Sequence, residues 1–462
     1  MKFFPLFISV LFFIQESISG LDGTRLSLAW GGGPFLGILL SLSLLPAFAP
    51  SFWHRHYGKI ISGWTFSFMI PAFSCHFMAT LESTVHILLM EYIPFVALIG
   101  ALFVVTGGIR LKSSWVGSPA SNMGVLFLGT FLSSWIGTTG ASMLLIRPLI
   151  QANAWRRHQS HIFIFFIFLV ANIGGALTPL GDPPLFIGFL EGVPFFWPLK
   201  NLMGPTFFLI SCLLTLFFII DTWFFRKEDL PPPTLDVKGA VKLNGKINIL
   251  FLALILILVL GSGYLNTGIY FNIFGNHVYV ENIMRDFFMI IISFLSLRLT
   301  RKRVREDNHF SWDPLIEVAK VFFGIFLTVM PILAILKAGE HGSLKSLISQ
   351  VSNNGAPDNT MYFWITGFFS SFLDNAPSYL VFFFMAGGDA AVLTTTLNKT
   401  LMAISMGAVY LGAMTYIGNA PNFMIRSIAN RQGIKMPTFF MFIVWSFFVL
   451  VPFFVLMSYL YL

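Results

Sequence analysis

Apolar runs long enough to cross a lipid bilayer recur along the whole chain, and this feature decides what it can fold into. A membrane helix needs about 20 mostly apolar residues. Runs of that kind lie near 32–50, 60–80, 83–105, 160–178, 202–225, 247–264, 279–298, 313–336, 397–417 and 437–460. A hydrophobic share of 56% with only 10% charged residues lies far outside the range of soluble domains. The predicted fold class is therefore an all-α polytopic membrane protein.

Two further apolar stretches, 122–150 and 361–388, are interrupted near the middle by Gly, Pro, Asn and Asp. Lipid offers no hydrogen bonds, so non-helical backbone at membrane depth must face protein or a water-filled cavity. We interpret both stretches as re-entrant hairpins. Residues 1–20 have a basic start, an apolar core and small residues at the exit. This pattern predicts a signal peptide, with an extra N-terminal span as the alternative.

The basic residues indicate topology rather than nucleic-acid binding, although the net charge is +8. With residue 21 outside, most Lys and Arg, among them Arg55, Lys59 and Arg156, fall in predicted cytoplasmic loops, such as 226–246 and 298–305. We predict a multi-pass protein of the cell inner (plasma) membrane, with the lipid bilayer as a partner and no nucleic acid. The basic run from Arg301 to Arg305 is also compatible with lipid binding, but topology is the simpler interpretation.

The sequence contains a duplication with an offset of 237 residues. At this offset "GALTPLGDPPLF" from Gly175 aligns with "GAMTYIGNAPNF" from Gly412, and "FLSSWIGTTGAS" from Phe131 aligns with "FFSSFLDNAPSY" from Phe368. We predict inverted repeats, each of five transmembrane helices plus one re-entrant hairpin, with broken helices at the bilayer midplane. The first repeat is assigned to 21–225, a cytoplasmic linker to 226–246, and the second repeat to 247–462.

The interruptions carry polar side chains whose ligand atoms are almost all oxygens. The predicted substrate or ion-binding residues are Thr138 and Thr139 in the first hairpin, Asp374, Asn375 and Ser378 in the second, Asn172, Thr178 and Asp182 in the first broken helix, and Thr415, Asn419 and Asn422 in the second. Such an inventory suits a hard cation such as sodium, or a proton on a carboxylate. Asp182 and Asp374 are the candidate sodium ligands. The alternative for the Asn and Thr residues is that they satisfy backbone freed by Gly and Pro.

Other chemistry has little support in the sequence. Clusters of His and Cys with transition-metal spacing are absent, and we predict no cofactor beyond a transported or coupling sodium ion and proton. Glu91, in the middle of an apolar run, is a candidate proton relay. A hydrogen bond from Glu91 to a neighbouring helix is the alternative.

These motifs resemble the ion transporter superfamily, which includes sodium/proton antiporters, citrate and dicarboxylate carriers and arsenite pumps. "NIGGALTPLGDPP" and "SSFLDNAP" look like that family's first broken helix and second hairpin, and "GAMTYIGNAPN" looks like its second broken helix. The resemblance covers roughly residues 30–460. It implies a scaffold part and a transport part in each repeat, an elevator-like movement, and a homodimer through the scaffold. The first hairpin carries Gly137 and Thr138 where some antiporter patterns carry an Asp-Asn pair.

Three functions compete. In a sodium/proton antiporter, burial of Asp182 and Asp374 favours their protonated form and a bound cation favours their ionised form, so competition for one site couples the two ions. A cation-coupled symporter of citrate or a related carboxylate is the alternative. No Arg or Lys lies at the predicted tips to neutralise such an anion, which favours antiport. An intramembrane aspartyl protease is a remote third, because "PLGDPP" lacks the first Gly of the Gly-x-Gly-Asp motif that those enzymes carry. We therefore expect a transporter and not an enzyme.

Overall fold

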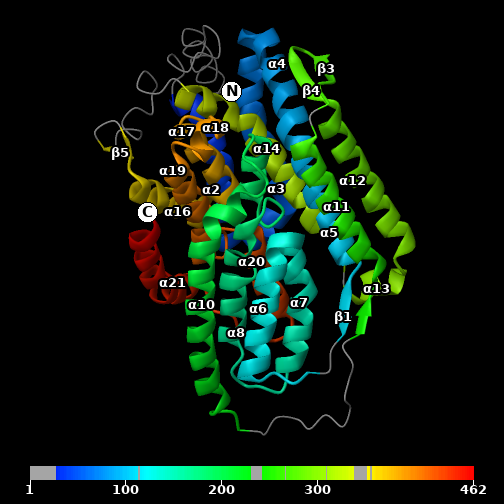
Figure 1. The fold of residues 1–462 in the computed structure, drawn as a ribbon, viewed down its shortest axis with the longest axis vertical. Coiled ribbons are helices and arrows are strands. Elements are labelled where there is room, and N and C mark those ends of the chain that lie inside the picture. Colours follow the sequence, from blue (N-terminus) through cyan, green and yellow to red (C-terminus); the bar gives the residue numbers. More distant parts are fainter. Residues whose placement is uncertain are drawn as a thin grey trace, which may run out of the picture.

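The computed structural model describes residues 28–112, 115–229, 242–265, 267–308, 310–337, 351–353 and 356–462 (Figure 1). The predicted signal segment 1–20 and residues 230–241 of the predicted linker lie outside this range. Within it, six helices are long and apolar enough to cross a membrane. They are Phe77–Gly107, Ser160–Leu177, Trp197–Phe225, Ile247–Tyr264, Asp313–Leu336 and Phe439–Tyr461. The prediction of an all-α polytopic membrane protein is confirmed at this level.

One group of helices packs together away from the interruptions. It comprises α2 (Leu28–Phe48), α3 (Pro50–Cys75), α4 (Phe77–Ile87), the π-helical turn η1 (Leu88–Tyr92), α5 (Ile93–Gly107), α11 (Ile247–Tyr264), α12 (Val280–Leu299) and α14 (Asp313–Lys337). Helix α14 packs on α2 and α3, while α12 packs on α5 and α11 along one side of the molecule (Figure 1). Large apolar side chains such as Ile257 and Ile290 point outward from this group, as expected for contact with lipid.

The predicted run 60–80 is displaced in the structure. Helix α3 begins at Pro50, because proline suits the first helical position, and it ends at Cys75. The backbone at His76 leaves the helical region with φ −141°, and α4 begins at Phe77. The predicted bounds of this element were therefore wrong. The sequence between 72 and 80 has neither Gly nor Pro to mark the break.

Two helical hairpins occupy the interrupted stretches. Helices α6 (Pro119–Ile136) and α7 (Thr138–Asn153) meet at Gly137, and α16 (Asn359–Leu373) and α17 (Asn375–Met385) meet at Asp374. The two reversals have nearly the same backbone conformation, with φ 81° and ψ 148° at Gly137 and φ 78° and ψ 145° at Asp374. These positions are 237 residues apart, which is the offset of the sequence duplication.

Two broken helices pass beside the hairpins. The first consists of α8 (Ser160–Leu169), the 3-10 turn η2 (Ile173–Leu177) and α9 (Pro183–Leu190), and the second of α19 (Asn398–Leu411), η4 (Gly412–Met414) and α20 (Ala420–Arg431). Residues 161–169 of α8 and 400–411 of α19 are all buried. From Ile162 to Leu169 helix α8 is apolar all round, and a helix of that kind belongs in a core. The core therefore lies around these two helices.

The hydrogen bonds of the two passages correspond at the same offset. Ser134 Oγ donates to the Gly174 carbonyl, and Ser371 Oγ donates to the Leu411 carbonyl. Thr178 Oγ1 donates to the Ser134 carbonyl, and Thr415 Oγ1 donates to the Ser371 carbonyl. The repeated residues thus satisfy the unwound backbone of each broken helix in the same way.

The remaining elements are peripheral. Helices α10 (Trp197–Phe225) and α21 (Phe439–Tyr461) pack on each other, and α13 (Lys302–Asp307) and α18 (Ala390–Thr394) are short. Three antiparallel ribbons pair β1 (Arg110–Lys112) with β2 (Lys242–Asn244), β3 (Tyr270–Ile273) with β4 (Asn276–Tyr279), and β5 (Ser352–Asn353) with β6 (Ala356–Pro357). The first ribbon joins the end of α5 to the start of α11.

Candidate functional site

The carboxylate of Asp182 lies where both hairpins and both broken helices meet. Its Oδ1 accepts hydrogen bonds from Thr138 Oγ1 at 3.1 Å and from Asn419 Nδ2 at 3.0 Å. Its Oδ2 accepts from Asn375 Nδ2 at 2.5 Å. All four side chains are nearly inaccessible to solvent, and Asp182 is 2% exposed. Four segments that are far apart in the sequence therefore share one buried carboxylate.

The broken helices aim Asp182 and Asn419 at this point. Each residue precedes a helix, α9 or α20, and has extended backbone there. Asp and Asn in that position usually cap the helix with the side chain. Neither does so here, so both side chains are directed at their partners across the molecule. Asp182 and Asn419 are equivalent positions of the duplication and are hydrogen-bonded to each other.

Asp374 occupies a backbone conformation that favours glycine. Its carboxylate accepts a hydrogen bond from the Asn375 backbone N–H at 2.7 Å, and Ser378 Oγ donates to its carbonyl at 2.8 Å. With φ at 78° and ψ at 145°, a residue with a Cβ is strained by about 1–3 kcal/mol. Strain of this kind persists only where the surrounding structure enforces it, and it is concentrated at functional sites. The strain therefore marks Asp374 as a candidate functional residue.

Replacing Asp374 by alanine should therefore destabilise the protein more than replacing it by glycine, with a difference of about 1–3 kcal/mol. Both variants lack the carboxylate, and only alanine keeps the strain. Thermal unfolding of the two purified variants measures the difference. Gly137→Ala is the matched control, because a Cβ at Gly137 would meet no atom closer than 3.4 Å and would add strain without a clash. Equal midpoints for the two Asp374 variants would contradict this account.

Asn375 supplies a buried acceptor to which no described residue donates. Its Nδ2 donates to Asp182, which fixes the orientation of the amide, and its Oδ1 is left with no hydrogen-bond partner among the described residues. A buried polar atom without a partner is costly and rare in folded proteins. An oxygen of this kind close to a carboxylate is suited to a cation.

The two remaining asparagines join the broken helices to each other. Asn172 Nδ2 donates to Asn422 Oδ1 and to the Ile167 carbonyl, both at 2.8 Å. Asn422 Nδ2 donates to the carbonyls of Gly412 and Thr415, both at 2.9 Å. These amides connect unwound backbone of one half with that of the other.

The other predicted residues have different places. The hydroxyls of Thr178 and Thr415 donate to carbonyls of α6 and α16. They thus satisfy backbone carbonyls, which was the alternative to ion binding for these two residues. Thr139 is half-buried at the hairpin tip and Glu91 is buried in η1. A role for either in ion binding or proton transfer stays a prediction.

A cavity adjoins the tip of the first hairpin. Its polar wall is formed by Thr138, Thr139 and Asp182, and its apolar wall by Phe95, Leu98 and Leu102 of α5. The cavity places Asp182 at the boundary between the interrupted segments and the helix group that contains α5.

A comparison with protein families matches residues 23–462 to a family described as "Putative citrate transport". The chain belongs to this family. No curated protein matches it. The citrate-transport family is a transporter family, so the chain is a multi-pass membrane protein that moves a small substrate. This agrees with the superfamily resemblance of the sequence motifs.

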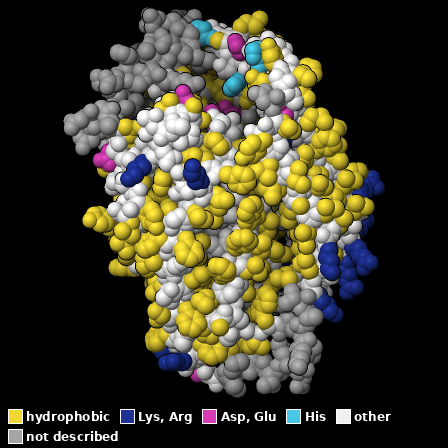
Figure 2. All heavy atoms as spheres, in the orientation of Figure 1, with side chains coloured by type: hydrophobic (Ala, Val, Ile, Leu, Met, Phe, Trp, Pro, Cys, Tyr) yellow, Lys and Arg dark blue, Asp and Glu magenta, His cyan; other side chains and the backbone are white. Residues whose placement is uncertain are grey.

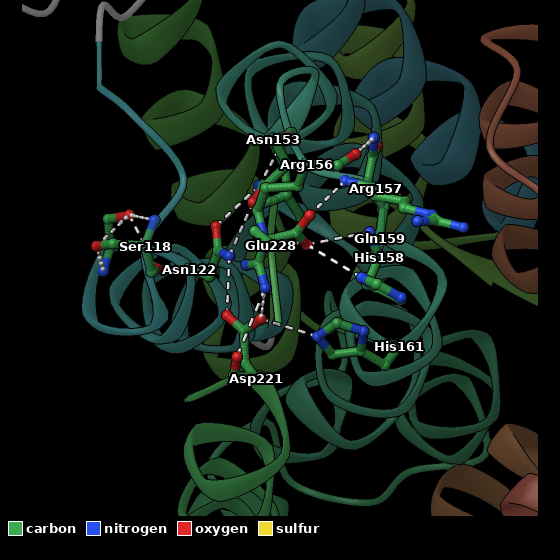
Figure 3. Close-up of polar contacts among 12 residues, drawn as sticks. Ser118, Asn122, Asn153, Arg156, Arg157, His158, Gln159, His161, Asp221 and Glu228 are labelled. Carbon is green, nitrogen blue, oxygen red and sulfur yellow. Dashed lines mark hydrogen bonds and ion pairs between the residues drawn. The ribbon is translucent and has the colours of Figure 1, made fainter. Parts of the chain in front are cut away.

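This citrate-transport family member also contains a polar centre that sequence reasoning missed. Asp221 of α10 accepts from Asn122 Nδ2 at 3.0 Å, and lies 2.6 Å from Arg156 Nη2 and 2.8 Å from His161 Nε2 (Figure 3). Asn122 and Asn153 exchange two amide hydrogen bonds beside it. Helix α6, α8 and the end of α7 are thereby joined to α10.

Glu228 extends this centre beyond the end of α10. It accepts from the backbone N–H groups of Arg157 and His158 and lies 3.5 Å from Arg156 Nε (Figure 3). The signal available in the sequence was Asp221 within the apolar run "LFFIIDTWFF". An intramembrane acid of this kind needs a partner.

Proposed function

We propose that the chain is a secondary transporter that exchanges sodium for protons at a site centred on Asp182. The observation that carries this proposal is the unpartnered Oδ1 of Asn375, on the amide that donates to the Asp182 carboxylate. Carboxylate and amide oxygens are suitable ligands for a hard cation. Thr138, Asn375 and Asn419 would hold Asp182 in place while the cation or proton exchanges.

Charge balance supports competition between the two ions. Neither Asp182 nor Asp374 forms an ion pair with any Lys, Arg or His that the structure describes. The two carboxylates are close enough for their charges to interact. Two uncompensated charges in a buried site are costly, so a proton or a cation must accompany them. Protonation would release the cation, and binding of the cation would release the proton.

The repeated architecture supports an elevator-like alternating-access mechanism. The shared offset of the hairpins and the contact between the equivalent positions Asp182 and Asn419 are the features expected of inverted repeats with re-entrant hairpins. Phe95, Leu98 and Leu102 offer the tip of the first hairpin an apolar surface. Apolar side chains form no hydrogen bonds that would have to break if the site moved past α5.

Proton movement in proteoliposomes tests this proposal. An inward sodium gradient is expected to drive protons out of vesicles that contain the wild-type protein, as recorded by a pH-sensitive dye in the lumen. A potassium gradient of the same size is the matched control and should drive little. If sodium moves no protons while the protein is folded and correctly inserted, antiport is rejected.

Cation-coupled uptake of a carboxylate is the second candidate. The description of the family favours it, and so do Arg147 of α7 and Arg426 of α20. Both arginines are half-buried, and neither forms an ion pair in the described part of the chain. Helices α7 and α20 pack on each other and each begins at the site; Arg147 lies nine residues further along α7, and Arg426 lies six residues further along α20. Sodium-dependent uptake of labelled citrate would favour this function over antiport.

The family assignment favours transport over the intramembrane protease. Location in the cell inner membrane, a homodimer through the scaffold, and the division into repeats at 21–225 and 247–462 stay predictions.

A further inference from the structure

Four basic side chains form an exposed surface where α12 ends and α13 begins. We call Arg298, Arg301, Lys302 and Arg303 the basic corner; all four are exposed. Figure 2 shows Lys and Arg side chains gathered over this part of the molecule, beside an apolar surface. The corner lies on the helix group away from the Asp182 site.

The basic corner has no carboxylate partner in the described part of the chain. None of its four members lies within 4.0 Å of an acidic group in the described ranges. Other basic residues do have one, as in the pairs of Arg110 with Asp307 and of Arg285 with Asp286. Glu306 is exposed further along α13 but pairs with none of the four. The corner therefore keeps a concentrated positive charge.

The next basic residue in the chain holds the corner in place. Arg305 is buried, and its guanidinium donates to the Val104 carbonyl and to Ser296 Oγ, both at 2.7 Å. Burial lowers the pKa of Arg305 to about 10, so it remains charged at neutral pH. Asn308 donates to the carbonyls of Gly107 and Ile109. These bonds fix α13 against the end of α5, so the corner is a preformed surface.

An apolar face leads directly into the corner. Phe287, Ile290 and Phe294 share one face of α12 and are each more than half exposed. The Arg298 guanidinium lies 5.1 Å from the centre of the Phe294 ring, which turns its charge toward the end of this face. A ligand that fits both parts has an anionic head and a long apolar body.

We propose that the basic corner binds the phosphate headgroup of an anionic phospholipid whose acyl chains lie along the exposed face of α12. Clusters of Lys and Arg beside a membrane helix attract anionic lipid, and the attraction weakens with salt. A soluble phosphate compound would use the charge but leave the apolar face uncovered. The inference does not depend on which ion the protein transports.

Lipid-dependent stability of the purified full chain in non-ionic detergent tests the proposal. Adding phosphatidylglycerol should raise the thermal midpoint of the wild type by several degrees, while phosphatidylcholine should not, because a ligand of the folded state stabilises it. In Arg301→Gln/Lys302→Gln/Arg303→Gln this shift should fall to less than half. High salt should reduce the wild-type shift.

A matched control separates a site from diffuse attraction. Arg55→Gln/Lys59→Gln removes exposed charges of α3, on the side also predicted to be cytoplasmic, and should keep the full shift. An unchanged shift in the triple variant, or an equal loss in the control, overturns the proposal. An equal shift with inorganic phosphate overturns it in favour of a soluble ligand. If the triple variant does not fold, native mass spectrometry of Arg301→Gln should show less bound phosphatidylglycerol than the wild type, and equal binding overturns the proposal.

Discussion

Replacing Asp182 by asparagine is expected to reduce sodium-driven proton flux at least about 100-fold. The Asp182 carboxylate accepts three hydrogen bonds, from Thr138, Asn375 and Asn419. An asparagine has the same shape but can neither take up the proton nor neutralise a cation. A factor of 100 corresponds to about 2.7 kcal/mol, which is the scale of one hydrogen bond to a charged group. Flux in proteoliposomes with matched protein content measures the effect.

Asp286→Asn is the matched control for this experiment. Asp286 is also a buried aspartate, but it lies within α12, away from the site, and is paired with Arg285. This variant should transport at close to the wild-type rate. In Asp182→Asn the new amide N–H can donate to the free Oδ1 of Asn375 once the Asn375 amide turns over, so that variant should stay folded, as thermal unfolding can verify. Undiminished flux in folded Asp182→Asn would remove the carboxylate from the mechanism.

Much of this site was predictable because the chain repeats its own interruptions. Aligning Asp182 with Asn419 at the 237-residue offset singled out both positions, and glycine and proline marked where each helix must break. The duplication also accounts for the backbone conformation of Asp374. The equivalent position of the first hairpin is Gly137, which has the same conformation. A repeat shows which positions are equivalent, but it does not show that two of them touch. The hydrogen bond between Asp182 and Asn419 required coordinates.

Features that depend on distant side chains could not be predicted in this way. The free oxygen of Asn375 results from the orientation of one amide, which the sequence does not specify. The sequence predicts that Arg156 is a basic residue of a cytoplasmic loop. In the structure it is buried against Asp221, which lies 65 residues further along the chain. Its position follows from how the end of α10 packs on α6 and α8.

Replacing Asp221 by leucine is expected to lower the free energy of unfolding by about 3–5 kcal/mol. Both side chains of the pair with Arg156 are fully buried. Removing the acid leaves the guanidinium with Glu228 at 3.5 Å as its remaining ion pair, and takes the acceptor from Asn122 and His161. A buried charge that loses its partner is far more costly than a pair that was never formed. Unfolding of the purified variant by increasing fractions of SDS measures the loss.

Two comparison variants show whether charge is the cause. Arg156→Met/Asp221→Leu removes both charges and should be more stable than Asp221→Leu alone, because apolar residues can replace a buried pair at little cost. Arg157→Met breaks an exposed ion pair: the side chains of Arg157 and Asp229 are 76% and 75% accessible. This variant should change the free energy of unfolding by about 1 kcal/mol or less. If the double variant is no more stable than Asp221→Leu, the loss comes from packing. In that case Asp221 would join α10 to the first hairpin through packing and through its hydrogen bond with Asn122, rather than through its charge.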